Sequence, residues 1–111
     1  MPNFNDRLEL RLADDGALLF DPRPEHEVAP DVVHFAVLAA LAEIAAAQSA
    51  GAPVLPAQVA LNLLRRARSA PLVARGRVLR SGRTLIVAEG EVTQAGELVA
   101  KAVVTFARAS G

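Results

Sequence analysis

The chain has 111 residues, of which 52% are hydrophobic and 4% aromatic, and its twelve basic side chains balance its twelve acidic ones. This length predicts a single domain over residues 1–111, with enough apolar material for a core. The zero net charge gives no electrostatic reason to expect nucleic acid or an anionic membrane as the main partner. The lack of cysteine excludes disulfides and thiolate metal sites, and two isolated histidines predict no metal site.

The first thirty residues predict a hairpin followed by a loop. Leucines alternate with charged residues from 8 to 12, which is typical of a half-buried strand. Asp14-Asp15-Gly16 has turn chemistry, and residues 17–20 can return as a short second strand. Residues 21–30 hold three prolines and no clean period, which indicates a loop with an exposed His26. The N-terminus MPNFNDRLEL lacks the layout of a signal peptide, so we expect a cytoplasmic protein.

Residues 32–51, VVHFAVLAALAEIAAAQSAG, predict one long helix around which the rest of the chain is organised. Apolar residues recur at helical spacing on one face, and most other positions are alanine. We expect Asp31 to cap this helix and Gly51 to end it. A membrane span is disfavoured, because Glu43 at the bilayer centre would cost about 3 kcal/mol. A helix that is apolar nearly all round must instead be wrapped by other elements.

After the helix, the hydrophobic period changes from helical to two. This period predicts strands over residues 59–64, 72–80, 83–93 and 98–106, with short turns between the last three. Strands joined by such turns form an antiparallel meander. Together the elements predict an α+β fold, in which a curved antiparallel sheet of five to six strands wraps one long central helix. The edge strands of that sheet favour pairing with a second copy.

Glu43 is the single charged side chain of the predicted helix and the first candidate for chemistry. A carboxylate that is enclosed among apolar residues has a raised pKa, which suits a catalytic base or nucleophile. The alternative is a polar residue on a helix edge that meets solvent. His34, at the start of the helix, can equally be a structural residue bonded to the backbone.

Four strings, HFAVLAALAEIAAA, QVALNLLRRA, VLRSGRTLIVAEGEV and GELVAKAVVTF, resemble in sequence and order the hotdog-fold acyl-CoA thioesterases of the phenylacetate-pathway type. The resemblance covers roughly residues 8–106. Members of this family usually show His-Gly-Gly at the helix start and an Asp or Glu nine positions after that His, a separation that His34 and Glu43 share. The Asn of the first long strand, Asn62, and the Leu-Arg-Ser-Gly-Arg-Thr-Leu turn at residues 79–85 also match in position.

The chain departs from the family pattern near the helix start. Phe35 and Ala36 stand where the family has its two glycines, and Val28 stands where relatives often carry an Asn. A further strand position, where some relatives place Ser or Thr, is occupied by Gln58. These departures bear on activity and leave the expected fold unchanged.

The resemblance implies thioester hydrolysis at a cleft built across a dimer, with coenzyme A as part of the substrate and no separate cofactor. Glu43 would be the base or nucleophile, and backbone amides around Phe35 and Ala36 would hold the oxyanion. Gln58 would orient the water or the carbonyl from the partner chain. The candidate catalytic residues are therefore Glu43, His34, Phe35, Ala36 and Gln58.

Arginines after the first long strand and around the later turn can bind the phosphates of coenzyme A, because guanidinium groups suit phosphate. The candidate residues are Arg65, Arg66, Arg80, Ser81 and Arg83. The alternative for Arg65, Arg66 and Arg68 is a solvated rim.

Two other functions stay open beside hydrolysis. One is a non-hydrolytic hotdog module that binds acyl-CoA or acyl-carrier thioesters, or merely assembles. The other is a dehydratase or isomerase of the same fold, although the His-to-Glu spacing and the Pro-Gly of such relatives are not found here. In each case we expect a homodimer or a dimer of dimers.

Overall fold

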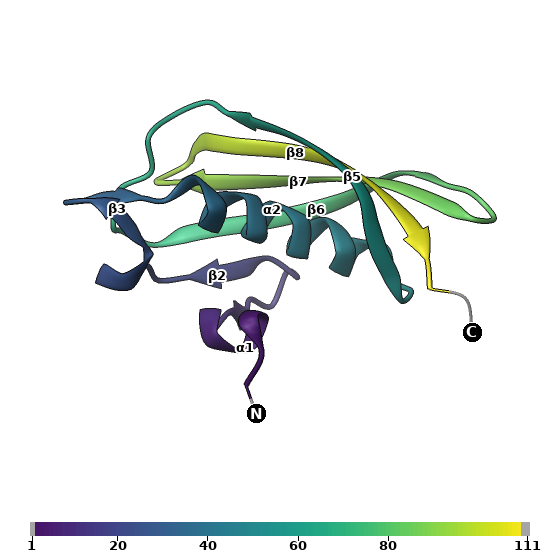
Figure 1. Ribbon diagram of the computed structural model, residues 1–111, viewed down its shortest axis with the longest axis horizontal. Coiled ribbons are helices and arrows are strands. Elements are labelled where there is room, and N and C mark those ends of the chain that lie inside the picture. Colours follow the sequence, from purple (N-terminus) through teal and green to yellow (C-terminus); the bar gives the residue numbers. More distant parts are fainter. Residues whose placement is uncertain (1, 110–111) are drawn as a thin grey trace.

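The computed structural model describes residues 2–109 and has one long helix lying across one face of a six-stranded antiparallel sheet (Figure 1). The helix is α2 (Phe35–Ser49). The strand order is β1 (Arg11–Leu12), β2 (Leu18–Phe20), β6 (Leu72–Ser81), β7 (Leu85–Gln94), β8 (Glu97–Arg108) and β5 (Val54–Leu63). The smaller elements are helix α1 (Phe4–Leu8), the 3-10 turn η1 (Pro24–His26), and a separate pair formed by β3 (Glu27–Ala29) and β4 (Val32–Val33). This architecture confirms the expected hotdog fold.

One face of the sheet is apolar and the other is polar, as the alternation of residues along the strands predicted. Ile86, Ala88 and Val92 of β7 are buried on the face that α2 covers, and residues 100, 102, 104 and 106 of β8 are buried beside them. On the outer face, Arg77 and Lys101 both pair with Glu89. The hydrogen bond from Lys101, with a further one from Arg77, holds the pKa of Glu89 below its ordinary value despite burial. The outer face of these strands is therefore polar.

The helix packs unusually close to the sheet, because two paired glycines lie beneath it. Gly76 of β6 and Gly90 of β7 are register partners. A Cβ atom on Gly76 would lie 2.0 Å from the carbonyl oxygen of Ala45, and one on Gly90 would lie 1.9 Å from that of Ala42. Alanine on the sheet side of α2 fits this short separation, whereas larger side chains would push the helix away from the sheet.

Replacement of Gly90 by alanine is expected to destabilise the fold by at least the roughly 1–3 kcal/mol that overpacking usually costs. The added methyl group would meet backbone atoms of α2, which cannot rotate away as a side chain can. The midpoint of urea unfolding measures the loss. Gly82→Ala is the comparison variant and should cost less, since its new Cβ meets one backbone oxygen at 3.0 Å, whereas that of Gly90→Ala meets three backbone atoms at 1.9 to 2.9 Å. An unchanged midpoint for Gly90→Ala would show that α2 moves freely on the sheet.

The N-terminal region differs from the sequence prediction. Leu8 ends helix α1 instead of opening a strand, because Asn3 and Asp6 form a capping box that starts a helix. The predicted loop over residues 21–30 contains η1 and β3. His26, which we expected to be exposed, packs edge-on against Phe20 with ring centroids 5.0 Å apart, and its partial burial lowers its pKa.

Helix α2 begins at Phe35 instead of Val32, and Asp31 does not cap it. The two β-branched valines before the helix form β4, whose Val33 N–H donates to the carbonyl of Ala67 at 2.9 Å. The carboxylate of Asp31 accepts hydrogen bonds from the Ser69 N–H and the Arg68 Nε, both at 3.0 Å. The helix cap is His34.

The remaining boundaries follow the sequence closely. Gly51 follows α2 with a φ of 68°, as its predicted role as a helix stop requires. Strand β5 starts at Val54, earlier than residue 59, and β6 to β8 form the expected meander. None of the helices within residues 2–109 is long and apolar enough to cross a membrane.

Candidate functional site

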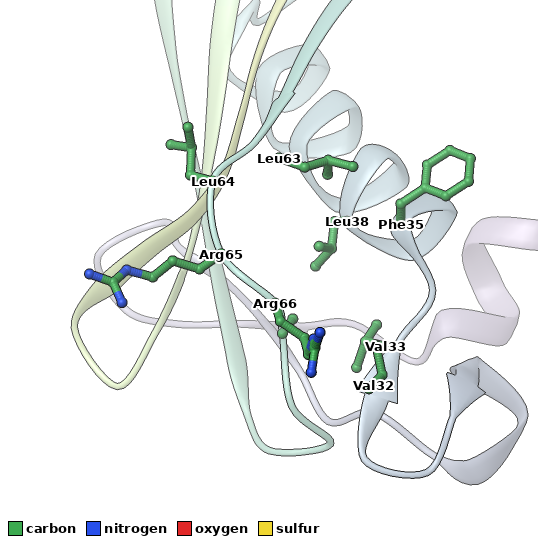
Figure 2. Close-up of a pocket in the computed structure, with 9 residues that line it drawn as sticks. Val32, Val33, Phe35, Leu38, Leu63, Leu64, Arg65 and Arg66 are labelled. Carbon is green, nitrogen blue, oxygen red and sulfur yellow. The ribbon is translucent and has the colours of Figure 1, made fainter.

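A pocket of about 410 Å³ opens beside the N-terminal end of α2 (Figure 2). Its walls come from β4, from the first turn of α2, and from the end of β5 with the segment that follows. The lining residues are Val32, Val33, Phe35, Leu38, Leu63, Leu64, Arg65, Arg66 and Ala67. The walls are thus mostly apolar, they include two arginines, and they contain no carboxylate. This volume and composition are typical of a small-molecule site.

The segment after β5 is held in place by hydrogen bonds to β8 and to the end of β7. The N–H groups of Leu64 and Arg65 donate to the Val99 carbonyl at 2.9 and 3.2 Å. The side-chain amide of Gln94 accepts from the Arg68 N–H at 2.9 Å and donates to the Arg68 carbonyl at 2.8 Å. This wall of the pocket is therefore fixed before any ligand binds.

The two amides that we predicted as oxyanion donors differ in availability. The Ala36 N–H already donates to Nδ1 of His34 at 2.9 Å, so His34 is the structural cap of the helix. Phe35 is the first residue of α2, so its N–H has no intrahelical acceptor. It also makes no hydrogen bond within residues 2–109. Phe35 therefore provides the free amide at this helix end, while its ring stacks on His34 with centroids 4.7 Å apart.

Glu43 is half-buried on α2, and desolvation by burial raises the pKa of its carboxyl group, as the sequence predicted. It does not line the pocket at the helix start. Eight residues separate it from Phe35, which is about 12 Å along the helix axis at 1.5 Å per residue. This separation is long for a water molecule that Glu43 activates to attack a carbonyl held by the Phe35 N–H of the same protomer.

Gln58 and Asn62 lie on β5 with their side chains on the face opposite α2. Gln58 follows a bulge and pairs with Thr105, whereas Asn62 pairs with Lys101. The alternate residues of β8, including Val104, are those buried toward the helix. Gln58 consequently does not point toward Glu43 of its own protomer, and its catalytic role stays a prediction. No group of three or more potential metal ligands occurs within residues 2–109.

The chain from residue 44 to residue 88 contains seven arginines and no carboxylate. Four of the seven are neutralised by acidic residues from other parts of the fold. These ion pairs are Arg65–Glu97 at 3.1 Å, Arg68–Asp31 at 3.0 Å, Arg75–Asp15 at 2.8 Å, and Arg77–Glu89. The other three, Arg66, Arg80 and Arg83, form no ion pair within residues 2–109. Within this stretch, these three are the cations left for an anionic ligand.

The free arginines lie at opposite ends of the molecule. Arg66 lines the pocket at the start of α2, whereas Arg80 and Arg83 line a hollow of about 390 Å³ on the β6–β7 hairpin. That hairpin projects beyond the C-terminal end of the helix (Figure 1). The residues predicted to bind coenzyme A are therefore divided between the two ends of one protomer.

The sequence analysis overlooked Arg108 at the hairpin. Its Nη2 donates to Oγ of Ser81 and its Nε donates to the Gly82 carbonyl, both at 3.0 Å. The pairing of Leu85 with Ala107 brings the end of β8 to this turn. The predicted antiparallel meander could have revealed this position, because consecutive strands return to the same end of the sheet.

This fold is shared by solved structures of the thioesterase superfamily. The family model described as the acyl-CoA thioesterase N-terminal domain matches residues 23–107, so the chain belongs to this family. No curated protein sequence matches the chain.

The solved structures that share this fold include the following three. A zebra fish thioesterase superfamily member 2 has 20% identity, a TM-score of 0.86, and coverage of 97% of this chain and 88% of its own. A phenylacetic acid degradation-related protein from Ralstonia eutropha has 24% identity, a TM-score of 0.82, and coverage of 96% and 90%. A Bacillus halodurans protein solved with CoA has 20% identity, a TM-score of 0.82, and coverage of 92% and 72%.

Proposed function

We propose that this protein hydrolyses acyl-CoA thioesters at a site shared by two copies, with Glu43 as the base or nucleophile. The observation that carries this proposal is the half-buried Glu43 carboxyl, whose burial raises its pKa on a helix with no other charged side chain. Family membership supplies the class of substrate. The reaction needs water and protein groups, with coenzyme A as the leaving group.

Strand β5 is the surface that we assign to the second copy. It is a ten-residue strand at the edge of the sheet, with no charged side chain and with exposed Leu55, Val59 and Leu63. An edge of this length without charges invites pairing with another strand. Antiparallel pairing of β5 with its copy about a twofold axis gives one continuous sheet with both α2 helices on the same face.

Within one protomer, Glu43 lies far from the Phe35 N–H, and Arg80 and Arg83 lie far from the pocket at the start of α2. This dimer brings both pairs together across the interface. Antiparallel pairing reverses the second copy, so that the pocket end of one protomer lies toward the hairpin end of the other. Glu43 of one copy then acts on a carbonyl that is held by the Phe35 N–H of the other. Arg80 and Arg83 bind the nucleotide phosphates of a substrate whose thioester reaches the opposite pocket. A dimer of dimers is compatible with the polar outer face.

In the hydrolytic step, the Glu43 carboxylate takes a proton from water as the water oxygen bonds to the thioester carbonyl carbon. The carbonyl oxygen becomes an oxyanion that accepts a hydrogen bond from the Phe35 N–H. Collapse of this intermediate breaks the carbon–sulfur bond, and the departing thiolate receives the proton from Glu43. If Glu43 is instead the nucleophile, its carboxylate attacks the carbonyl carbon through an oxyanion held by the same amide, and the carbon–sulfur bond breaks to release the CoA thiolate and leave a mixed anhydride. Water then cleaves the anhydride, which regenerates Glu43, and the thiolate takes the released proton.

The second candidate is a module that binds acyl thioesters without hydrolysing them. The observation that favours it is the Phe35 side chain, which is 55% exposed at a position where relatives have glycine. A ring at this position narrows the approach of a carbonyl to the amide.

Release of free thiol from a panel of acyl-CoAs, followed with a thiol-reactive dye, separates the two functions. We expect the purified wild-type protein to release thiol and to sediment as a dimer or a dimer of dimers. Binding of acyl-CoA with no thiol release from any member of the panel would support the non-hydrolytic module. A protein that stays monomeric at micromolar concentration would overturn the shared site.

A further inference from the structure

The pocket at the start of α2 holds one cation whose charge is not neutralised. Figure 2 shows the Arg66 side chain extending across the pocket toward Val32, whereas the Arg65 side chain points away. Arg65 is paired with Glu97 at 3.1 Å, and Arg68 with Asp31 at 3.0 Å. Of these three neighbouring arginines, only Arg66 forms no ion pair with a carboxylate within residues 2–109.

The backbone on both sides of Arg66 is fixed. The N–H of Arg65 bonds to the Val99 carbonyl, and the carbonyl of Ala67 accepts from the Val33 N–H at 2.9 Å. The exposed Arg66 side chain thus starts from a fixed backbone position at the rim of an open pocket. The apolar chamber is the part of this pocket that Val33, Leu38 and Leu63 line. This part suits a hydrocarbon chain, and a single cation at the rim suits a single anion.

We propose that Arg66 selects acyl groups that end in a carboxylate, with the hydrocarbon part of an ω-carboxyacyl chain in the apolar chamber. This inference rests on the proposed function, because it takes the pocket to be the acyl site. A guanidinium group binds a carboxylate through two parallel hydrogen bonds. The phosphates of coenzyme A, which carry several charges, match the free arginines of the hairpin better.

Two coenzyme A thioethers test the assignment without any hydrolysis: S-hexyl-CoA and S-(5-carboxypentyl)-CoA. They have the same coenzyme A and similar chain length, and only the second carries a terminal carboxylate. We expect calorimetric titration of the wild-type protein to show the carboxylated analogue binding about 10- to 100-fold more tightly. Arg66→Gln should remove this preference. Arg65→Gln, the matched control, should retain it, because the Arg65 guanidinium is paired with Glu97 and its side chain is directed away from that of Arg66.

Three results would overturn the inference. The wild-type protein could bind both analogues equally, or bind neither. Alternatively, Arg66→Gln could weaken both analogues by the same factor, which would assign Arg66 to a phosphate of coenzyme A. The proposed hydrolysis can fail separately. If the protein hydrolyses no acyl-CoA but still binds the carboxylated analogue more tightly, the hydrolysis proposal is wrong and the selectivity proposal stands. If the protein hydrolyses acyl-CoAs but binds both analogues equally, only the selectivity proposal is wrong.

Discussion

Replacement of Glu43 by glutamine is expected to lower kcat for acyl-CoA hydrolysis about 10²- to 10⁴-fold, the range over which a positioned general base contributes. Glutamine has nearly the same shape but cannot accept the proton of the attacking water. The substrate pocket does not include Glu43, so KM should change little. Steady-state thiol release measures both constants. Glu91→Gln, on the outer face of β7, is the matched control and should keep wild-type kcat.

The same variant should change the pH dependence of the rate. Because burial raises the pKa of Glu43, the wild-type rate should fall as the pH is lowered through that raised value. Glu43→Gln should lose this acidic limb together with its activity. If the residual activity of the variant kept the wild-type limb, another group would be the base.

Glu43→Gln should raise the thermal stability of the protein although it lowers the activity. An acid whose pKa is higher in the folded state contributes stability that is full below its unfolded pKa and lost as the pH rises through the folded value. Glutamine does not ionise, so Glu43→Gln should have a higher Tm than the wild-type protein above that pH. The difference should vanish in acid. Equal Tm values at neutral pH would show that Glu43 is solvated in solution.

The fold could be predicted from the sequence where one local pattern had no competitor. The alanine-rich run of α2 indicates a helix, and the alternation of Ile86, Ala88 and Val92 indicates a strand. Both elements were predicted correctly. Leu8 was misassigned because its alternation with Leu10 competes with the capping signal of Asn3 and Asp6. Capping favours the helix, since it satisfies backbone amides that a two-residue strand would leave free.

The site was less predictable, because its decisive contacts join distant parts of the chain. Asp31 is a good helix cap by its residue type, yet it bonds Arg68 and Ser69, and His34 takes its place. Nothing local distinguishes Arg66 from Arg65, whose partner Glu97 lies on another strand. The spacing of His34 and Glu43 fits the family, but only helix geometry reveals the rise of about 12 Å between Glu43 and the free amide. Our proposal therefore divides these two groups between two protomers.

That division predicts complementation between two inactive variants. Phe35→Pro removes the N–H that we assign to the oxyanion, at the helix position where proline is best tolerated. The preceding His34 has a φ of −62° and a ψ of 139°, which suits a residue before proline. Loss of one oxyanion donor costs about 10²- to 10³-fold in kcat. Phe35→Ala keeps the N–H and is the matched control, so it should retain far more activity.

Mixed dimers of Phe35→Pro and Glu43→Gln should recover activity that neither parent has. In such a dimer, one site combines the intact Glu43 of the first chain with the intact Phe35 amide of the second, while the other site carries both defects. Random mixing of equal amounts should restore about a quarter of the wild-type kcat, since half of the dimers are mixed and each has one intact site. Refolding the variants together and measuring thiol release tests this value. Mixtures no more active than their parents would contradict the division of the site between two chains. Glu43 and Phe35 of one chain are eight residues and about 12 Å apart along α2, so the Phe35 amide would then be abandoned as the oxyanion donor.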